Sequence, residues 1–553
     1  MKTAKNYKLH QVVKFPQKVL LFAKELISAP PQNTSDLEKK KRNFSARNKV
    51  PTILNRDIIA IISRENLVAP SSLLQILQKR SVRTISGVTP VAILTRPFGC
   101  PGKCIYCPSE PKMPKSYISS QPAAARALRN KFHPREQTLN RLAALVDSGH
   151  PVSKLEIIIM GGTWSALPAQ YQEWFIKEIF DTVNECKSED LKEAQKINET
   201  ADRRIIGLTT ETRPDFITEK ELMRLRKFGC TRVELGVQTL DDKISRETKR
   251  NCTALRVAQA TELLKNYGFK ICYHMMPGLP GSTMKKDLAM LKKTMEDPRY
   301  SPDFVKIYPC QVLKNSELYD IWKKGKFEPL HDRDLVKLIL RFKKFVPPWV
   351  RIMRLLRDIP VSDIVSGAKF SNLRQILHSQ PEKIKEIIGE KDFREIFGSS
   401  FVWPCKCIRC RELGFVSDKH WKKLKPVLKR RDYQSSGGTE VFLSFETSDE
   451  QTLFSLLRLR IPGKINFKKS RDFFASAALI REIHSYGSEI SVGQGKGQGQ
   501  HRGLGKKLIR EAEKIAKIEF KKQKMVIIAG VGTREYYRQA GYTEENTYMV
   551  KDL

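Results

Sequence analysis

Residues 91–108 read Val-Ala-Ile-Leu-Thr-Arg-Pro-Phe-Gly-Cys-Pro-Gly-Lys-Cys-Ile-Tyr-Cys-Pro, an apolar run followed closely by three cysteines. The run Val91–Leu94 has the apolar, partly β-branched composition of a buried strand. Cys100, Cys104 and Cys107 come next, with the spacing Cys-x3-Cys-x2-Cys. Clustered cysteines in a chain without a secretory signal indicate a metal site rather than disulfides. The segment therefore predicts a strand with metal ligands beyond its carboxyl end.

Short apolar runs recur after residue 88, separated by longer amphipathic stretches. The strand-like runs are Val91–Leu94, Leu155–Met160, Arg204–Thr209, Arg232–Val237, Phe269–Met275 and Phe304–Tyr308. The helix-like stretches between them include Glu219–Phe228, Ala254–Tyr267 and Met284–Met295. Regular alternation of this kind is typical of a parallel sheet with right-handed crossovers. We therefore expect an α/β fold, a barrel or a doubly wound sheet, with its chemistry at the carboxyl ends of the strands.

The first cysteine cluster has the composition of an iron–sulfur site. Three thiolates can hold three irons of a 4Fe–4S cluster and leave the fourth iron open. The open iron can chelate S-adenosylmethionine (SAM), and electron transfer from the cluster then yields a 5′-deoxyadenosyl radical. A structural zinc site normally takes four ligands, and no fourth Cys or His lies close by in the sequence. The spacing resembles the radical-SAM superfamily, which implies a partial (β/α)6 barrel.

Glycine and polar residues stand at the ends of the following strands, where that fold binds SAM. Glycines after the second strand allow close backbone approach, which suits the methionine amino group. Acidic and basic side chains after the third strand suit the ribose and the carboxylate. The predicted SAM-binding residues are Gly161, Gly162, Thr163, Glu211, Arg213, Glu234 and Gln238.

The C-terminal block, from about residue 435, predicts a separate α+β domain. Strand-like runs at Glu440–Phe445, Leu453–Leu459 and Ala477–Ile483 precede a Gly/Gln-rich loop and a helix, Leu504–Phe520. The loop fits Gln/Arg-x-x-Gly-x-Gly, the pyrophosphate cradle of GNAT acetyltransferases, in which backbone N–H groups and the helix dipole face the phosphates. A tyrosine after the next strand can reach the thioester of acetyl-CoA. The predicted acetyl-CoA-binding residues are Gln500, Arg502, Gly503, Leu504, Gly505, Tyr536 and Tyr537, with the two tyrosines as catalytic candidates.

A second cluster, Cys405, Cys407 and Cys410, supplies three soft ligands within six residues. Structural zinc is the predicted occupant, and an auxiliary iron–sulfur cluster is the alternative. The fourth ligand must come from elsewhere in the chain. Cys310, at the end of the sixth strand, is the first candidate, and His378 and His331 are the others.

The amino-acid composition narrows the class of molecule that the protein is expected to bind. The 553 residues include 100 Lys and Arg against 60 Asp and Glu, for a formal net charge of +40, with 40% hydrophobic residues. Such a chain is too apolar for wholesale disorder, and it has no apolar run near the roughly 20 residues of a membrane helix. Residues 1–80 alone carry sixteen basic and five acidic residues. A basic excess on this scale favours a polyanionic partner, nucleic acid above all.

Four regions follow from these patterns. We expect a basic, nucleic-acid-binding region at 1–80, a radical-SAM core at 81–344, a linker with the second cysteine cluster at 345–434, and a GNAT domain at 435–553. The apolar run Val19–Ala23 is followed at once by Lys24 and Glu25, so no signal peptide is predicted. A cytoplasmic location is expected, because the clustered cysteines need a reducing compartment.

Taken together, the motifs resemble the catalytic subunit of Elongator, in its stand-alone prokaryotic form. The matching segments include Arg83–Val88, Cys100–Pro108, Gln121–Arg126, Met160–Thr163, Glu211–Asp215, Arg354–Pro360, Arg430–Tyr433, Gln500–Gly505 and Gly530–Tyr537. The resemblance runs from about residue 80 to the end of the chain. Eukaryotic members space the first cysteine more widely and lack most of the 405–410 cysteines, so dependence on other Elongator subunits is in doubt here.

The resemblance implies modification of C5 of the wobble uridine of tRNA. In the family's proposed route, acetyl-CoA bound to the GNAT domain loses a hydrogen to the deoxyadenosyl radical. The resulting carbon radical adds to C5, and thioester hydrolysis leaves 5-carboxymethyluridine. The implied partners are a tRNA anticodon stem-loop, whose target base is splayed into a pocket, a low-potential electron donor and a second copy in a homodimer. Lys306, which is also a catalytic candidate, and Tyr308 are candidate residues of the uridine pocket.

Two other functions are compatible with parts of the sequence. A protein lysine acetyltransferase would use the GNAT domain, with the cluster domain as a scaffold, but would leave the predicted SAM-binding residues without a role. A non-enzymatic RNA-binding factor would leave both cofactor motifs without a role.

Overall fold

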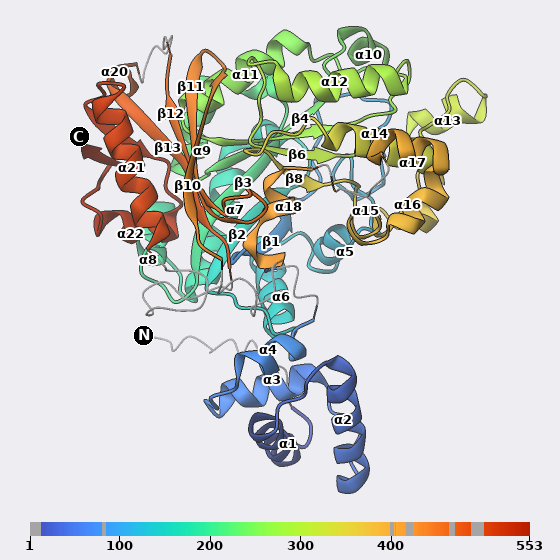
Figure 1. Ribbon diagram of the computed structural model, residues 1–553, viewed down its shortest axis with the longest axis vertical. Helices are drawn as coiled ribbons and strands as arrows, with labels where there is room; N and C mark the ends of the chain where they lie inside the picture. Colours follow the sequence, from blue (N-terminus) through green and yellow to red (C-terminus); the bar gives the residue numbers. More distant parts are fainter. Residues whose placement is uncertain are drawn as a thin grey trace.

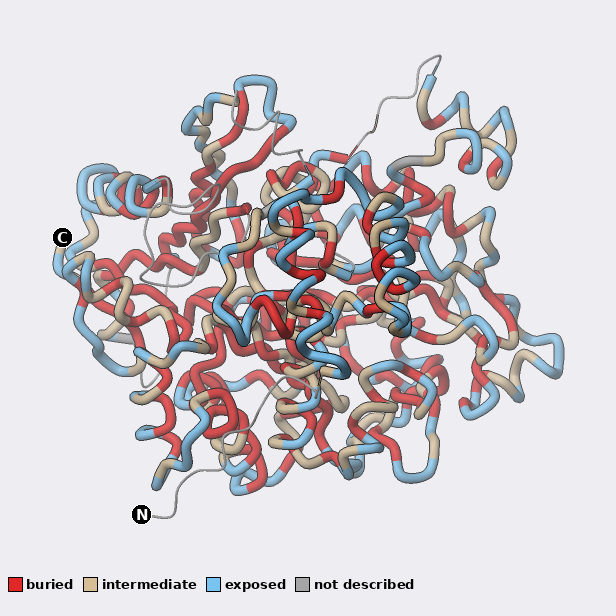
Figure 2. Tube along the Cα trace, turned by 90° about the horizontal axis from the view of Figure 1, so that it is seen from below, coloured by how far each residue is buried: buried red, intermediate tan, exposed pale blue. Residues whose placement is uncertain are grey.

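The computed structural model describes residues 13–79, 84–398, 403, 405–415, 424–463, 471–487 and 503–553. It has a central body, a second sheet packed against one side of that body, and a small helical unit that projects from it (Figure 1). In the view from below, buried residues concentrate in the strands, and exposed residues lie along the outer helices (Figure 2). No helix of the described residues is long and apolar enough to cross a membrane.

The projecting unit has its own apolar core. Its helices are α1 (Pro16–Ser28), α2 (Thr34–Asn48), α3 (Asn55–Arg64) and α4 (Ser71–Leu77). Asn33 caps α2 by accepting a hydrogen bond from the backbone N–H of Asp36 at 3.0 Å. The core joins residues of all four helices, namely Val19, Phe22, Leu37, Phe44, Ile58, Ile61, Leu73 and Leu77.

The body is built on a seven-stranded, wholly parallel sheet in the order β1-β2-β3-β4-β5-β6-β8. The strands are β1 (Thr89–Leu94), β2 (Lys154–Met160), β3 (Arg204–Thr212), β4 (Arg232–Gln238), β5 (Lys270–Met275), β6 (Phe304–Ile307) and β8 (Arg351–Arg354). The six predicted strands and the radical-SAM partial barrel are confirmed. β8 extends the sheet into the region expected to be linker.

Helices surround this sheet, and most of them cover its outer face. They are α5 (Pro122–Arg129), α6 (Pro134–Val146), α7 (Ala169–Asn184), α8 (Leu191–Asn198), α9 (Glu219–Lys227), α10 (Asp242–Glu247), α11 (Ala254–Asn266), α12 (Met284–Glu296), α13 (Glu317–Lys323) and α14 (Asp332–Lys343). Of these, α10 and α13 pack with the loop after β1. Alternate residues of β1 and β2 are buried in the outer core, for example Val91 and Ile157. The intervening residues, Ala92 and Ile158, are only half-buried. They line cavities on the inner face, so the barrel interior is hollow at these strands.

A mostly helical segment follows β8. It contains β9 (Ile364–Ser366), paired with β7 (Val312–Leu313), and then α15 (Leu373–Ser379), α16 (Pro381–Ile388), α17 (Glu390–Phe397) and α18 (Ile408–Arg411). Trp403 and the three cysteines of the second cluster pack against the core that α14 shares with α15 and α16. The cysteine segment thus belongs to the body rather than to an extended linker.

The second sheet has the order β10-β11-β12-β13-β14-β16-β15, and only its β13–β14 pair is parallel. Its elements are β10 (Val427–Ser435), β11 (Gly438–Glu446), β12 (Leu453–Ile461), α20 (Arg471–Ala475), β13 (Ala477–Ser485), α21 (Leu504–Ile518), β14 (Lys524–Ile527), α22 (Arg534–Arg538), β15 (Thr543–Glu545) and β16 (Tyr548–Asp552). This mixed sheet with α21 across it is consistent with the predicted GNAT-like domain. Since β10 is its edge strand, the domain begins before residue 435.

The two sheets are joined by close backbone contact and by buried charge. A Cβ on Gly530 would lie 2.1 Å from the Ile206 carbonyl oxygen, so only glycine lets this loop pack on β3. Arg481, on β13, donates to both carboxylate oxygens of Asp303, at the start of β6, at 2.6 and 2.8 Å. It also donates to Glu440, on β11, at 2.8 Å. These charges are fully buried, so the two domains are held in a fixed register by paired groups.

Candidate active site

The first cysteine cluster lies in the loop after β1. Cys100, Cys104 and Cys107 all line a cavity of about 350 Å³ at the carboxyl ends of the barrel strands. The Cys107 N–H donates to the Cys104 carbonyl at 3.2 Å, and the Gly102 N–H donates to Cys100 Sγ at 3.4 Å. The loop therefore turns all three sulfurs toward one space.

The electrostatics of the loop favour the thiolate form of Cys104, while its hydrogen-bonded neighbour Cys107 has a raised pKa. A hydrogen bond from Cys107, helped by the charges of Arg250 and Arg213, lowers the pKa of Cys104 to about 5 against the effect of burial. Both arginines are almost fully buried. Thiolate is the form that binds metal, so the site is charged to receive a cationic iron centre.

Five described residues that line this cavity carry a buried polar atom without a hydrogen-bond partner: Tyr106, Arg213, Glu234, Gln238 and Arg250. Arg213 Nη1 and Gln238 Oε1 are two of these atoms. The rest of the Arg213 guanidinium is fixed by Asp215, with Nε to Oδ1 at 2.8 Å and Nη2 to Oδ2 at 2.9 Å. Gln238 is held at a φ of 70° at the end of β4. Buried polar groups are normally paired. Their placement beside the cysteines fits a polar ligand such as SAM next to a 4Fe–4S cluster.

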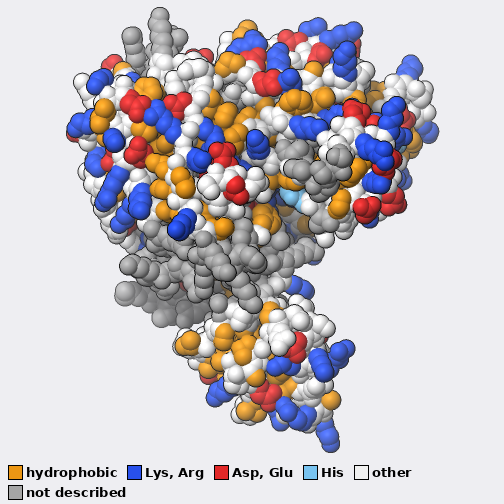
Figure 3. All heavy atoms as spheres, in the orientation of Figure 1, with side chains coloured by type: hydrophobic (Ala, Val, Ile, Leu, Met, Phe, Trp, Pro, Cys, Tyr) orange, Lys and Arg blue, Asp and Glu red, His pale blue; other side chains and the backbone are white. Residues whose placement is uncertain are grey.

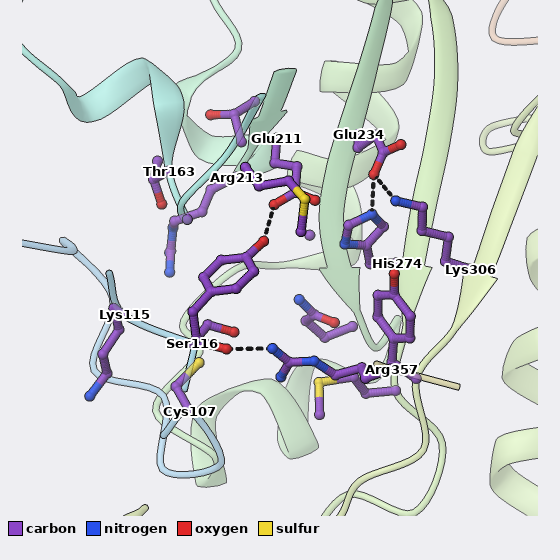
Figure 4. Close-up of a pocket in the computed structure, with 18 of the residues that line it drawn as sticks. Cys107, Lys115, Ser116, Thr163, Glu211, Arg213, Glu234, His274, Lys306 and Arg357 are labelled. Atoms are coloured by element: carbon purple, nitrogen blue, oxygen red, sulfur yellow. Dashed lines mark hydrogen bonds and ion pairs between the residues drawn. The ribbon is translucent and has the colours of Figure 1, made fainter. Parts of the chain in front are cut away.

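The two glycines after β2 have different surroundings: one is packed against the protein and the other lines the cavity. Gly161 has a φ of +132°, and a Cβ there would lie 2.1 Å from Thr95 Oγ1, so its role is close packing. Gly162 has a φ of +99° and lines the cavity with Thr163. Glu211 also lines it and accepts a hydrogen bond from the Tyr117 hydroxyl at 2.6 Å (Figure 4).

Glu234 is the centre of a buried ion cluster. Its Oε2 accepts from His274 Nε2 at 2.7 Å and from the Lys306 ammonium, and Arg232 lies 3.5 Å from Oε1. Burial disfavours the charged form, but Lys306, His274 and Arg232 outweigh it and hold the pKa of Glu234 well below its usual range. Two predicted residues, Glu234 and Lys306, are thus brought together. Their charged groups bind each other in the wall of the cavity, which leaves His274 as the member that faces its space.

A second cavity, of about 580 Å³, lies where the second sheet meets the barrel. The parallel pairing of β13 with β14 ends at Ile480 and Ile527, and the strands separate beyond it. Residues 480–484 of β13 and Ile528 line this cavity, together with Tyr537. The opening between the two strands is therefore continuous with a space above the barrel.

The predicted acetyl-CoA-binding residues fall into three groups. Tyr537 lines the second cavity. Tyr536 instead lies near Gly505, at the start of α21, where its hydroxyl is 3.1 Å from the position of an added Cβ. Gly503, at a φ of 76°, begins α21, and Leu504 is buried in its first turn. Gln500 and Arg502 lie outside the described residues.

The second cysteine cluster forms a compact group. The sulfurs of Cys405, Cys407 and Cys410 lie within 4.8 Å of one another, and the last two are 3.5 Å apart. His378 Nε2 is 3.6 Å from Cys410 Sγ. The buried Lys343 ammonium lies 3.4 Å from Cys405 Sγ. A zinc ion with bonds of about 2.3 Å separates tetrahedral sulfurs by about 3.8 Å, so these atoms are spaced for one.

The other candidates for the fourth ligand of this group lie elsewhere. Cys310 is buried with Cys104, Ile105 and Leu318 beside the first cluster. His331 stands before α14, where it pairs with Glu328 at 2.5 Å. The prediction of Cys310 is therefore wrong for this structure, because β6 ends on the cavity side of the barrel while the second cluster packs on α14.

Three functional groups were missed at the sequence level. His274 has a detectable signal, since it alternates with Cys272 on β5 and pairs across the sheet with Lys306. Lys343 and Asp303 have none, since their partners lie 62 and 178 residues away in the sequence.

Comparisons with known proteins agree with this geometry. Residues 95–293 match the Radical SAM superfamily, and residues 302–383 match its C-terminal domain. The tRNA uridine(34) acetyltransferase of Dehalococcoides mccartyi is 46% identical, over 86% of this chain and 100% of its own length. Human Elongator complex protein 3 is 36% identical over 96% of both chains. The structure of Methanocaldococcus infernus Elp3 lacking its N-terminus, 41% identical, superposes with a TM-score of 0.72 over 85% of this chain and 100% of that chain.

The fold, the cysteine loop and the first match define a radical-SAM protein, a class that binds a 4Fe–4S cluster and SAM. Within that class, the chain belongs to the Elongator complex protein 3 family.

Proposed function

We propose that this protein installs a carboxymethyl group at C5 of the wobble uridine of tRNA, with acetyl-CoA as the donor. Relatives at 44–46% identity carry the name tRNA uridine(34) acetyltransferase, which supports a tRNA substrate and an acyl donor. The cluster, the SAM site and the GNAT-like sheet each supply one part of that chemistry. A low-potential electron donor, a homodimer and a cytoplasmic location belong to the same proposal.

One observation carries the proposal, namely that the two cavities meet. Pro90, Ile158, Met353 and Arg354 line both of them. The first cavity contains the three cysteines, and the second contains Tyr537 and the separated ends of β13 and β14. A pantetheine arm that enters between β13 and β14 therefore has a route to the space beside the cluster loop. A plain acetyltransferase has no use for such a route.

In this mechanism the cluster and SAM, when bound, would supply a deoxyadenosyl radical. The residues of the chain would bind these groups and orient them. Cys100, Cys104 and Cys107 would hold the cluster. Arg213 Nη1 and Gln238 Oε1 are free to bind polar groups of SAM. The protein's task is to orient the cofactors and to shield the radical within the cavity.

The basic surface has a role in holding RNA phosphates. Lysine and arginine side chains are spread over the visible face of the body and over the projecting helical unit (Figure 3). On α2 and just after it, Lys39, Arg42, Arg47 and Lys49 are exposed. We assign this unit to tRNA binding, with the anticodon loop directed at the first cavity.

Anaerobic reconstitution tests the proposal. Protein, iron, sulfide, SAM, a reductant, acetyl-CoA and tRNA are expected to give 5′-deoxyadenosine and carboxymethyluridine, measured by nucleoside mass spectrometry. Omission of acetyl-CoA should remove the modified nucleoside. Acetylation of a protein lysine without any carboxymethyluridine would overturn the proposal in favour of a lysine acetyltransferase.

Replacing Tyr537 by Phe is expected to slow formation of free carboxymethyluridine by about a hundredfold, the cost of removing one donor to the oxyanion that develops on the thioester carbonyl during hydrolysis. Burial raises the pKa of Tyr537, so its hydroxyl stays protonated and can donate to the thioester carbonyl. The acetyl-CoA Kd should change little. Tyr542→Phe is the matched control, because its hydroxyl binds Glu513 in the same core and does not line the cavity. Full activity of Tyr537→Phe would remove the proposed thioester contact.

We also propose that Cys405, Cys407, Cys410 and His378 bind one structural zinc. Burial, with Lys343 and Arg374 nearby, lowers the pKa of His378 to about 3, so its imidazole is neutral, as a zinc ligand must be. The Lys343 ammonium offsets the negative charge of three thiolates.

The expected result for His378→Ala is loss of most of the zinc, with affinity reduced by more than about a hundredfold, because even outer-shell changes cost 10–100-fold. Metal analysis of the purified protein measures this. His331→Ala should keep its zinc, since that side chain is exposed and pairs with Glu328. Iron in place of zinc at this group, with the first cluster's cysteines removed, would favour the auxiliary iron–sulfur alternative.

A further inference from the structure

His274 forms a carboxylate–imidazole pair at the inner face of the barrel. Its Nε2 lies 2.7 Å from Glu234 Oε2. Glu234 has no solvent exposure, and Lys306 and Arg232 keep it ionised. An ionised carboxylate only accepts hydrogen bonds, so the shared proton sits on Nε2. In the tautomer with this proton on Nε2, the ring presents a lone pair at Nδ1.

That lone pair faces the cavity. Nδ1 has no hydrogen-bond partner among the residues that the structure describes, and the side chain is 12% exposed. In Figure 4 the imidazole lies between Glu234 and the open space enclosed by Glu211, Arg357 and Ser116. Tyr308 packs edge-on against the ring, with centroids 5.2 Å apart, and fixes its plane. The arrangement is that of a general base whose second nitrogen is oriented by a carboxylate.

A metal ion is a poorer explanation of the same group. Glu234, Cys272 and His274 do bring three ligand-type atoms within 4.8 Å. However, the Lys306 ammonium already contacts the carboxylate oxygen that faces His274. Burial also raises the pKa of Cys272, which keeps it a thiol. The cation of this site is a lysine, so the imidazole is left free for proton transfer.

The thioester of the proposed reaction must come close to this histidine. Once the acetyl-derived carbon is bonded to C5 of the uridine, the thioester carbonyl is the next atom along. In the proposed reaction the uridine enters the first cavity, which the cluster loop lines, and the coenzyme A arm would reach it past Ile158 and Met353, which line both cavities. His274 lines the first cavity. A water held by Nδ1 therefore shares this space with the carbonyl that must be hydrolysed.

Resting on the proposed function, we infer that His274 is the general base that releases the product from coenzyme A. Its Nδ1 takes a proton from water as the water oxygen bonds to the thioester carbonyl carbon. The carbon–sulfur bond then breaks, and the imidazolium returns the proton to the departing thiolate. A carboxylic acid and a thiol form, and no electron is transferred. Glu234 and Lys306 are positioning residues, which hold the ring and its tautomer.

The test is a single anaerobic turnover with His274→Asn or His274→Gln. Both variants are expected to form 5′-deoxyadenosine at close to the wild-type rate. Free carboxymethyluridine should appear at least about a hundredfold more slowly, the usual contribution of a general base. In its place, tRNA joined through a thioester to coenzyme A should accumulate, visible by intact mass and cleaved by hydroxylamine. Added imidazole should restore release.

His331→Asn is the matched histidine control, exposed before α14 and expected to behave as wild type. The intermediate can also be sought in the wild-type protein, by quenching a single turnover at successive times. The thioester species should form before free product, and it should decay more slowly in D2O because its hydrolysis includes a proton transfer from water. Two results would overturn the role of His274 without touching the proposed function. The variants could release free product at the wild-type rate, or they could stop before any thioester species forms. Absence of 5′-deoxyadenosine and of modified uridine with the wild-type protein overturns the proposed function instead.

Discussion

Cys104→Ala is expected to abolish SAM cleavage and carboxymethyluridine formation, by at least about a thousandfold, the scale on which loss of one member of a catalytic unit acts. Cys104 is the middle residue of the three-cysteine loop and the one whose thiolate the structure favours most. Cys107, Arg250 and Arg213 lower its pKa to about 5. Two remaining thiolates would leave two irons without a protein ligand. The measurements are iron content and 5′-deoxyadenosine yield.

Acetyl-CoA binding should survive this substitution. The second cavity is lined by the separated β13 and β14 ends and by Tyr537, and Cys104 is not among its residues. Isothermal titration of acetyl-CoA should therefore give the wild-type Kd. Cys186→Ala is the matched control, since this thiol is exposed in the loop after α7, lines neither cavity and should change neither readout. Loss of acetyl-CoA binding in Cys104→Ala would show that the two sites are one.

The strands of the barrel are predictable because their signal is local. Parallel strands often appear as short apolar runs: residues 157–160 form such a run, Ile-Ile-Ile-Met, while residues 232–238 alternate polar and apolar side chains. The cysteine loop is predictable for the same reason, since its spacing is contained in eight residues. β8 was missed because it is only four residues long and contains two arginines, which point into the barrel and its rim.

Groups whose partners are distant in sequence could not be predicted. Cys310 and the 405–410 cysteines are chemically compatible, but the sheet places them on different sides of the barrel. Glu234 has the residue type of a SAM ligand, yet its carboxylate is taken by Lys306 and His274 from the next two strands. In each case strand order, which no single motif encodes, decides the partner.

Asp303→Asn is expected to destabilise the docking of the two sheets by about 3–5 kcal/mol, the cost of removing one partner from a buried ion cluster. Asp303 is fully buried and binds Arg481 through both oxygens, with Arg458 at 3.6 Å. The Asn amide has one acceptor oxygen in place of two carboxylate oxygens and carries no charge. Glu440 would then be the one negatively charged partner left to Arg481 among the described residues. Urea titration, followed separately by signals from each domain, measures the loss. Asp297→Asn is the control, because its partner Arg299 is 62% exposed, and such surface pairs contribute less than about 1 kcal/mol.

The same substitution should change the acid limit of stability. Burial alone would raise the pKa of Asp303, but Arg481, Arg458 and Lys265 outweigh it and hold the value below the ordinary range. A carboxyl with a lowered folded-state pKa stabilises the protein above its unfolded value, about 3.9, and loses that contribution as pH falls further. Wild type should therefore lose stability steeply below about pH 4, while Asp303→Asn starts lower and declines less. Equal acid slopes for the two proteins would mean that Asp303 is not the anion that holds the sheets together.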